Sequence, residues 1–169
     1  MDEVARLLNH MVVDGVISAY AVFGAVAQMR YTDAVATLDA DILVAVPDAD
    51  RLDVLSPLYA YCRDRGHRPE GEAIRVGAWP VQFVPVFDAL TKAALEHAET
   101  GDLEGIPLRV VRADYLAAIG LSVGRPKDFT RVLALLENGS VRAEEVEVLC
   151  AQHNLLDRWQ RFKRNFLDV

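Results

Sequence analysis

Residues 21–47, AVFGAVAQMRYTDAVATLDADILVAVP, contain the features that decide the fold. The apolar run over residues 19–23 is typical of a buried strand, and it ends at Gly24. Residues 25–31 then have helical character. A glycine at such a turn lets the backbone approach a ligand, and the N–H groups that begin the helix can bind anions such as phosphates. A purely steric role for Gly24 is the alternative interpretation.

The end of the same stretch predicts the strongest strand of the chain, over residues 38–46. Side chains alternate along a strand, so Asp39 and Asp41 share one face while apolar residues fill the other. Two carboxylates so close together repel each other unless a cation lies between them, and their oxygens suit Mg²⁺. The pair therefore predicts a site for one or two magnesium ions; a solvated strand edge is the alternative.

The rest of the chain alternates between helical and strand patterns up to about residue 111 and is helical afterwards. Helices are expected at residues 3–16, 50–65, 89–98, 114–123, 126–137, 143–153 and 155–166, and further strands at 73–76, 81–86 and 108–111. The strands on either side of Gly77 are expected to form a hairpin. We therefore predict an α/β (α+β) fold with a mixed sheet flanked by helices over residues 1–111. Residues 112–169 are expected to form a C-terminal helical segment packed on this core.

Composition excludes several classes of protein. The net charge of −7 opposes broad DNA binding, which depends on neutralising phosphates with Lys and Arg. No apolar run approaches the ~20 residues that span a bilayer, and no signal peptide is visible at the N-terminus. Cys62 and Cys150 lie far apart and form no metal-binding spacing, so two buried thiols are expected. These features indicate a cytoplasmic protein without a membrane segment.

Taken together, the glycine turn, the helix and the DxD strand resemble the core signature of the nucleotidyltransferase superfamily, which has the polymerase-beta-like fold. A second stretch, residues 105–137 (GIPLRVVRADYLAAIGLSVGRPKDFTRVLALLE), extends the resemblance. It is similar to a segment of the branch that includes abortive-infection-type toxins and related uncharacterised bacterial proteins. In that segment a strand leads to a helix and then to an Arg-x-Lys-Asp turn. Together the two stretches cover most of residues 20–137.

The resemblance implies Mg²⁺-dependent transfer of a nucleotidyl group from an NTP to an RNA or protein acceptor. It also implies a role as the toxin half of a toxin–antitoxin pair, with a cognate antitoxin as partner. Catalysis and metal binding would fall to Asp39 and Asp41, and phosphate binding to Gly24, Ala25, Arg30, Arg125 and Lys127. In the Arg-x-Lys-Asp turn, Asp128 would order the two cationic neighbours; a solvated helix start is the alternative.

Three positions depart from the family pattern. Ala25 stands where many relatives have a serine, Gly120 where they often have a lysine, and Gln82 where a third acidic residue completes the metal site. An amide oxygen can bind Mg²⁺ but is a poor proton acceptor, so Gln82 is kept as the third candidate metal ligand. Asp88, which follows the strand, is an alternative candidate for the missing third carboxylate. These departures favour a second hypothesis, a catalytically degenerate nucleotidyltransferase fold that acts as a nucleotide-binding or protein-interaction module.

The C-terminal stretch RWQRFKRNF, residues 158–166, is both basic and aromatic. It supports a third hypothesis, an interaction protein whose terminal helices contact a partner such as RNA through charge and stacking. Alternatively, Trp159 and Phe162 face inward and close the core. The spacing of three residues favours the core interpretation because it fits one face of a helix.

Overall fold

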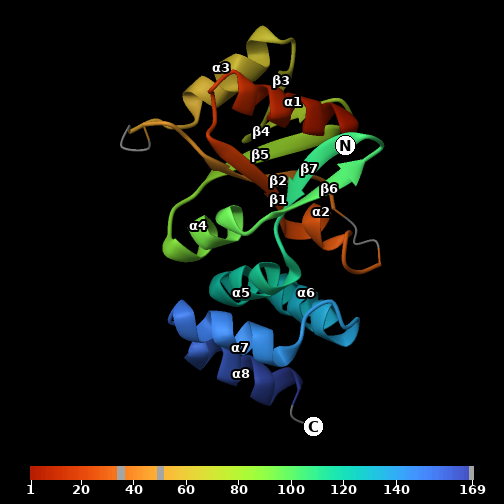
Figure 1. The fold of residues 1–169 in the computed structure, drawn as a ribbon, viewed down its shortest axis with the longest axis vertical. Helices are drawn as coiled ribbons and strands as arrows, with labels where there is room; N and C mark the ends of the chain where they lie inside the picture. The colour runs from red at the N-terminus through yellow and green to blue at the C-terminus, as the bar shows by residue number, and fades with distance from the viewer. Residues whose placement is uncertain (34–36, 49–51, 168–169) are drawn as a thin grey trace.

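The computed structural model describes residues 1–33, 37–48 and 52–167, and its centre is a seven-stranded mixed sheet (Figure 1). The strands in these residues are β1 (Ala19–Phe23), β2 (Ala40–Ala45), β3 (Arg68–Glu70), β4 (Ala73–Val76), β5 (Trp79–Pro85), β6 (Glu99–Leu103) and β7 (Ile106–Val110). The helices are α1 (Asp2–Val13), α2 (Gly24–Gln28), α3 (Ser56–Asp64), α4 (Ala89–Glu96), α5 (Ala113–Val123), α6 (Pro126–Glu137), α7 (Ala143–Gln152) and α8 (Leu156–Phe166). The sheet order is β3-β4-β5-β2-β1-β7-β6. The expected α/β fold, a mixed sheet flanked by helices, is confirmed.

Strand β2 lies at the middle of the sheet because its apolar residues need cover on both faces. Ile42, Leu43 and Val44 are completely inaccessible to solvent. β2 runs antiparallel to β1, with Asp41 opposite Phe23, and parallel to β5, with Asp41 opposite Gln82. The glycine turn after β1 and the candidate third ligand on β5 therefore both lie at the Asp41 end of β2.

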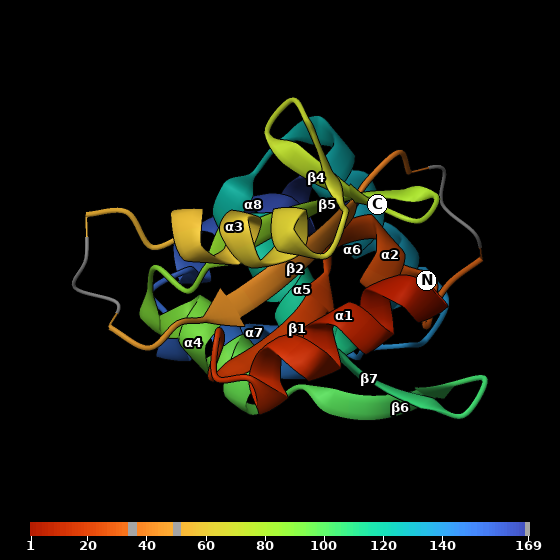
Figure 2. The ribbon, with the colours of Figure 1, turned by 90° about the horizontal axis from the view of Figure 1, so that it is seen from above.

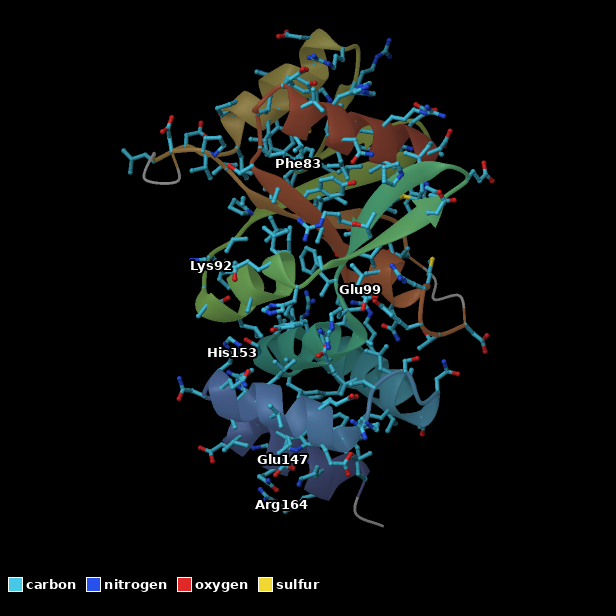
Figure 3. All side chains as sticks on the ribbon, viewed as in Figure 1. Phe83, Lys92, Glu99, Glu147, His153 and Arg164 are labelled. Atoms are coloured by element: carbon cyan, nitrogen blue, oxygen red, sulfur yellow. The ribbon has the colours of Figure 1, made fainter. Side chains whose placement is uncertain are left out.

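One face of the sheet is covered by α1 and α3, which Figure 2 shows from above. The hydroxyl of Tyr20 on β1 donates to Asn9 Oδ1 on α1 at 2.8 Å. The ring of Tyr59 on α3 packs edge-on against Phe83 of β5 with 5.8 Å between centroids, and Phe83 lies on the α3 side of the sheet (Figure 3). These contacts direct the even-numbered residues of β2 toward α1 and α3, so Asp41 faces the other way.

Helices α2 and α4 lie on the opposite side of the sheet, and α5 to α8 stack beyond them (Figure 1). β7 ends at Val110 and α5 begins at Ala113, so the connection from sheet to helices falls near residue 111. None of the helices in the described part of the chain is long and apolar enough to cross a membrane. The Asp41 face of the sheet thus looks toward the C-terminal helices.

The basic and aromatic stretch at the C-terminus packs inward through its aromatic residues. Trp159 is fully buried and Phe162 is 2% exposed, so the core interpretation is confirmed for these two side chains. The indole Nε1 of Trp159 donates to Glu147 Oε2 on α7 at 2.9 Å, and Figure 3 places Glu147 beside α8. Cys62 and Cys150 are buried free thiols, as expected.

The secondary-structure prediction was wrong at the two edges of the sheet. It missed the edge strands β3 and β6, whose residues are exposed or half-buried and polar and so show no apolar alternation. The β6–β7 hairpin turns at Glu104 and Gly105, both with φ in the left-handed region (+52° and +85°). Such two-residue turns usually carry Asn-Gly or Asp-Gly, so Glu-Gly gave no signal.

The helix predicted at residues 50–65 is shorter in the structure. It covers Ser56–Asp64, with Pro57 in its first turn, where proline is favoured because its missing N–H has no partner to lose. Residues 52–55 are not helical, and residues 50 and 51 lie outside the described part of the chain. The predicted hairpin about Gly77 and the helix end at Asn138 are both confirmed.

Candidate functional site

Gly24 and Asp41 form a single structural unit at the end of β1 and β2. Phe23 is paired with Asp41, so the next residue along β1 brings its backbone beside the carboxylate. Gly24 has a φ of +66°, and a Cβ built on it would lie 2.5 Å from Oδ2 of Asp41. A side chain there would push the Asp41 carboxylate aside. Glycine at this turn is therefore favoured both by the positive φ and by the close approach of the carboxylate.

Asp39 and Gln82 complete the oxygen donors around Asp41. Asp39 immediately precedes β2 on the Asp41 face, where its Oδ1 accepts from the Thr37 hydroxyl at 3.3 Å. Gln82 is the register partner of Asp41 on β5, so its side chain leaves the sheet on the same face. Mg²⁺ in proteins commonly takes one or two carboxylates and fills its other positions with water and phosphate oxygens. The donors present here fit that requirement.

Asp41 faces α6 across a cavity of about 70 Å³. The polar lining of this cavity, here called the Asp41 pocket, consists of Gly24, Gln28, Asp41, Arg125, Asp128 and Arg131. Its apolar lining comes from Phe23, Leu116, Ile119, Gly120, Val123 and Leu135. Small-molecule sites usually measure about 300–1,000 Å³. The Asp41 pocket therefore admits phosphate oxygens or a hydrated cation, and a nucleoside would lie outside it.

The cationic wall of the pocket is organised by Asp128, a buried carboxylate at the start of α6. Its Oδ2 accepts from Nε of Arg125 at 2.7 Å and its Oδ1 from Nη2 at 3.1 Å. Nη1 of Arg131 lies 3.6 Å from the same Oδ1. Asp128 also accepts from the backbone N–H of Arg125 and so caps the helix. These contacts are the way in which Asp128 can hold Arg125 in place, as expected from the sequence.

The charges around Asp41 act in opposite directions on its carboxyl group. Burial raises the pKa of Asp41 above its ordinary value, and the nearby charge of Asp39 raises this pKa further. The positive charges of Arg131, Lys127 and Arg125 lower the same pKa, in that order of strength. All three cations belong to the Arg-x-Lys-Asp segment or to the turn of α6 that follows it. The sequence-predicted pair Arg125 and Lys127 thus lies close enough to lower the pKa of Asp41 across the fold.

Other sequence-predicted residues lie apart from the pocket. Arg30 pairs with Glu99 of β6 at 3.4 Å, and Figure 3 places Glu99 near α2. Ala25 is buried, and α2 is only five residues long, so its N-terminus provides a weak dipole. Asp88 lies six residues beyond Gln82 and caps α4 by accepting from Thr91 N at 2.7 Å. It therefore does not supply a third carboxylate beside Asp41.

Gly120 has a packing role that the sequence did not reveal. A Cβ built on Gly120 would lie 3.0 Å from Cγ2 of Val132, because α5 and α6 approach closely at this point. A side chain at this position would force Val132 to move. Glycine at position 120 is therefore tied to the packing of α5 on α6.

Two solved structures identify the fold. The solution structure of the antibiotic-resistance factor ANT(2'')-Ia matches with a TM-score of 0.51 and 17% identity, covering 96% of this chain and 97% of that one. The crystal structure of an antigenic nucleotidyltransferase-like protein from Paracoccidioides brasiliensis matches with a TM-score of 0.53 and 10% identity, covering 94% and 93%. The chain has a nucleotidyltransferase-like fold. No protein-family model and no curated protein matches the sequence.

Within this nucleotidyltransferase-like fold, Gln28 and Arg131 are pocket residues that sequence reasoning missed. Gln28 lies in an apolar segment of the sequence and gave no signal there. In the structure its side chain is only 2% exposed, which is unusual for a glutamine and suggests a role. Arg131 follows Lys127 by four residues and Asp128 by three, so its side chain is a neighbour of both on the surface of α6. That periodicity was the signal available for Arg131. At identities of 10–17% the likeness establishes the fold, and any chemistry must be argued from these residues.

Proposed function

We propose that this chain is a magnesium-dependent nucleotidyltransferase that binds an NTP between Asp39–Asp41 and helix α6. The observation that carries the proposal is the Asp41 pocket, where a carboxylate on the sheet faces Arg125 and Arg131 on a distant helix. Carboxylates supply a metal site and guanidinium groups bind phosphate oxygens in pairs. The combination is suited to the phosphates of a nucleotide that arrives with its metal.

In this reaction, different residues of the chain would bind the metal and the phosphates. Asp39 and Asp41 hold the metal, with the Gln82 amide oxygen as a further ligand. When bound, Mg²⁺ would neutralise the charge that develops on the triphosphate during in-line displacement. Arg125 and Lys127 bind and orient the phosphates, and Asp128 keeps Arg125 in place. Gly24 leaves the space that the Asp41 carboxylate needs.

The acceptor in this proposal is a hydroxyl group of an RNA or a protein. Support comes from the similarity of residues 105–137 to the branch that includes abortive-infection-type toxins. On the same ground, the proposal extends to a toxin that is neutralised by a cognate antitoxin.

A second candidate function is a degenerate nucleotidyltransferase fold that binds nucleotide without turning it over. The observation that favours it is the register of β5, which places the uncharged Gln82 directly opposite Asp41. In the described residues no group of three or more Asp, Glu, His or Cys side chains is arranged to hold a metal. An amide cannot take a proton from an acceptor hydroxyl, so turnover would be slow or absent.

Transfer of label distinguishes the two functions. The protein is incubated with each α-labelled NTP and Mg²⁺ in the presence of total RNA and of total protein. The first function predicts labelled acceptor with the wild type and at least a hundredfold less with Asp41→Asn. The matched control, Asp157→Asn, removes an exposed carboxylate from the first turn of α8 and is expected to retain full transfer. Binding of NTP without label in any acceptor would support the degenerate fold instead.

A further inference from the structure

Arg131 is the pocket residue for which neither the family pattern nor the sequence provided a role. It lies on α6, one helical turn beyond Lys127, and lines the same cavity as Gly24 and Asp41. Its side chain is 25% exposed, so most of its length is packed against protein. A guanidinium group in this position is directed at whatever occupies the pocket.

Two contacts fix Arg131 on the pocket wall. Nη1 lies 3.6 Å from Oδ1 of Asp128, and the backbone carbonyl of Arg131 accepts from Nε2 of Gln28 at 3.4 Å. Asp128 already accepts two closer hydrogen bonds from the side chain of Arg125. Because a guanidinium has five N–H donors, Arg131 keeps donors for a ligand while its charge is held in place.

The pocket is balanced in charge without any bound ion. Its wall carries two carboxylates, Asp41 and Asp128, and two guanidinium groups, Arg125 and Arg131. The half-buried Asp39 and the exposed Lys127 add one charge of each sign. A second Mg²⁺ would need the carboxylate that Gln82 replaces, whereas a bound triphosphate would find positive charge already in place on α6.

We infer that Arg131 binds a phosphate group of the NTP in the Asp41 pocket and provides positive charge in place of a second metal ion, so that the site takes one divalent cation per nucleotide. The inference rests on the proposed function, since it assumes an NTP at Asp39 and Asp41. It goes further by assigning a phosphate-binding residue and a metal stoichiometry. The size of the pocket agrees, because about 70 Å³ holds only a few water-sized groups.

Electron paramagnetic resonance of Mn²⁺ tests the stoichiometry. The full chain is titrated with Mn²⁺ at a saturating concentration of a non-hydrolysable ATP analogue, and the amounts of free and bound Mn²⁺ are measured. We expect one Mn²⁺ per chain, and two Mn²⁺ per chain would overturn the inference. The measurement does not depend on turnover, so it applies equally to an active enzyme and to a degenerate one.

Variants of Arg131 test the phosphate contact. Loss of a charge-assisted hydrogen bond in Arg131→Gln should weaken binding of the analogue about tenfold to a hundredfold. Binding of Mn²⁺ alone should be unchanged or tighter, because a positive charge near Asp41 has been removed. A merely structural role would weaken both. Arg131→Lys should recover part of the affinity, and Arg161→Gln, an exposed cation of α8, should change neither.

The proposed function and the role of Arg131 can be contradicted by different results. If Asp41→Asn binds Mn²⁺ as the wild type does, the metal site itself is wrongly assigned and the proposed function fails. If Asp41→Asn loses Mn²⁺ but Arg131→Gln binds the analogue with wild-type affinity, only the role of Arg131 fails.

Discussion

Gly24 shows how one residue without a side chain determines the geometry of the whole site. It combines a φ of +66° with a backbone that lies against Oδ2 of Asp41. Gly24→Ala should therefore incur about 1–2 kcal/mol for the left-handed backbone and displace the carboxylate as well. We expect lower stability in urea unfolding and loss of Mg²⁺-dependent nucleotide binding in calorimetry.

The matched control for Gly24 is Gly15. Its φ of +71° is similar, but a Cβ there meets nothing within 4 Å. Gly15→Ala should lose a comparable amount of stability from backbone strain and keep full nucleotide binding. Equal binding by the two variants would show that the space at Gly24 does not serve the Asp41 carboxylate.

The raised pKa of Asp41 gives the site a pH dependence whose sign is fixed. Burial and the neighbouring charge of Asp39 keep the pKa of Asp41 above its ordinary value of 3.8. Asp41 therefore takes up a proton at a higher pH than a solvated carboxyl group does, and it then ceases to bind a cation. Affinity for Mn²⁺ should fall on acidification with a midpoint above pH 3.8. A midpoint at or below that value would contradict the electrostatic description of the pocket.

At the scale of helices and strands, the start of α6 can be compared with the start of α7, because both use the same capping arrangement. Asp128 caps α6 and pairs with Arg125, while Glu145 caps α7 and pairs with Arg142. Asp128 is buried, whereas Glu145 is exposed to solvent. Asp128→Asn should therefore cost about 1–3 kcal/mol, since two arginines lose a buried counterion.

Glu145→Gln is the control for this comparison and should change stability only slightly, because water replaces its partner. Thermal and urea unfolding of the two variants measure the difference. Similar losses from both would mean that the buried position of Asp128 adds nothing to the capping interaction. Asp128→Asn should also weaken nucleotide binding by releasing Arg125 from the pocket wall.

The sequence predicted some elements well because their signals are local. The alternation of Leu38–Val46 located β2 and its acidic face, and the apolar run before Gly24 located β1. The edge strands β3 and β6 have few buried residues and left no such alternation. Gln82 was singled out only through the resemblance, as the third candidate ligand, and the register of β5 places it opposite Asp41.

The remaining part of the site depends on packing between segments far apart in the chain. Arg125 and Arg131 face Asp41 only because α5 packs against α2 and α4 and α6 packs against α5. No local pattern in residues 112–137 specifies which strand end they will face. The resemblance to a known segment suggested Arg125 and Lys127, and it passed over Arg131 and the buried Gln28.

At the scale of the whole molecule, the candidate site joins the sheet to the C-terminal helices. Ser140 donates to the carbonyl of Tyr31 at 2.7 Å, and Gln28 donates to that of Arg131, so α2 and α6 are connected beside the pocket. We expect the two parts to unfold together. The tryptophans report on each part separately, because Trp79 lies in β5 and Trp159 in α8.

Single-tryptophan variants, Trp79→Phe and Trp159→Phe, test this coupling by fluorescence during urea unfolding. Each variant should give one transition that coincides with its loss of circular dichroism, and saturating NTP with Mg²⁺ should shift both transitions upward. Non-coincident transitions would show that residues 1–111 and 112–169 are independent units. A shift confined to Trp159→Phe, the variant that keeps Trp79, would mean that the C-terminal helices take no part in binding.

The central claim is that Asp41 and α6 form one magnesium and nucleotide site, and its most direct measurement is calorimetric titration of the full chain with each NTP. Titrations are made with Mg²⁺ and with EDTA, on the wild type and on Asp41→Asn. We predict binding of at least one NTP that Mg²⁺ strengthens and that Asp41→Asn abolishes. Binding that is indifferent to both Mg²⁺ and the substitution, or no binding of any NTP to the wild type, would contradict the claim.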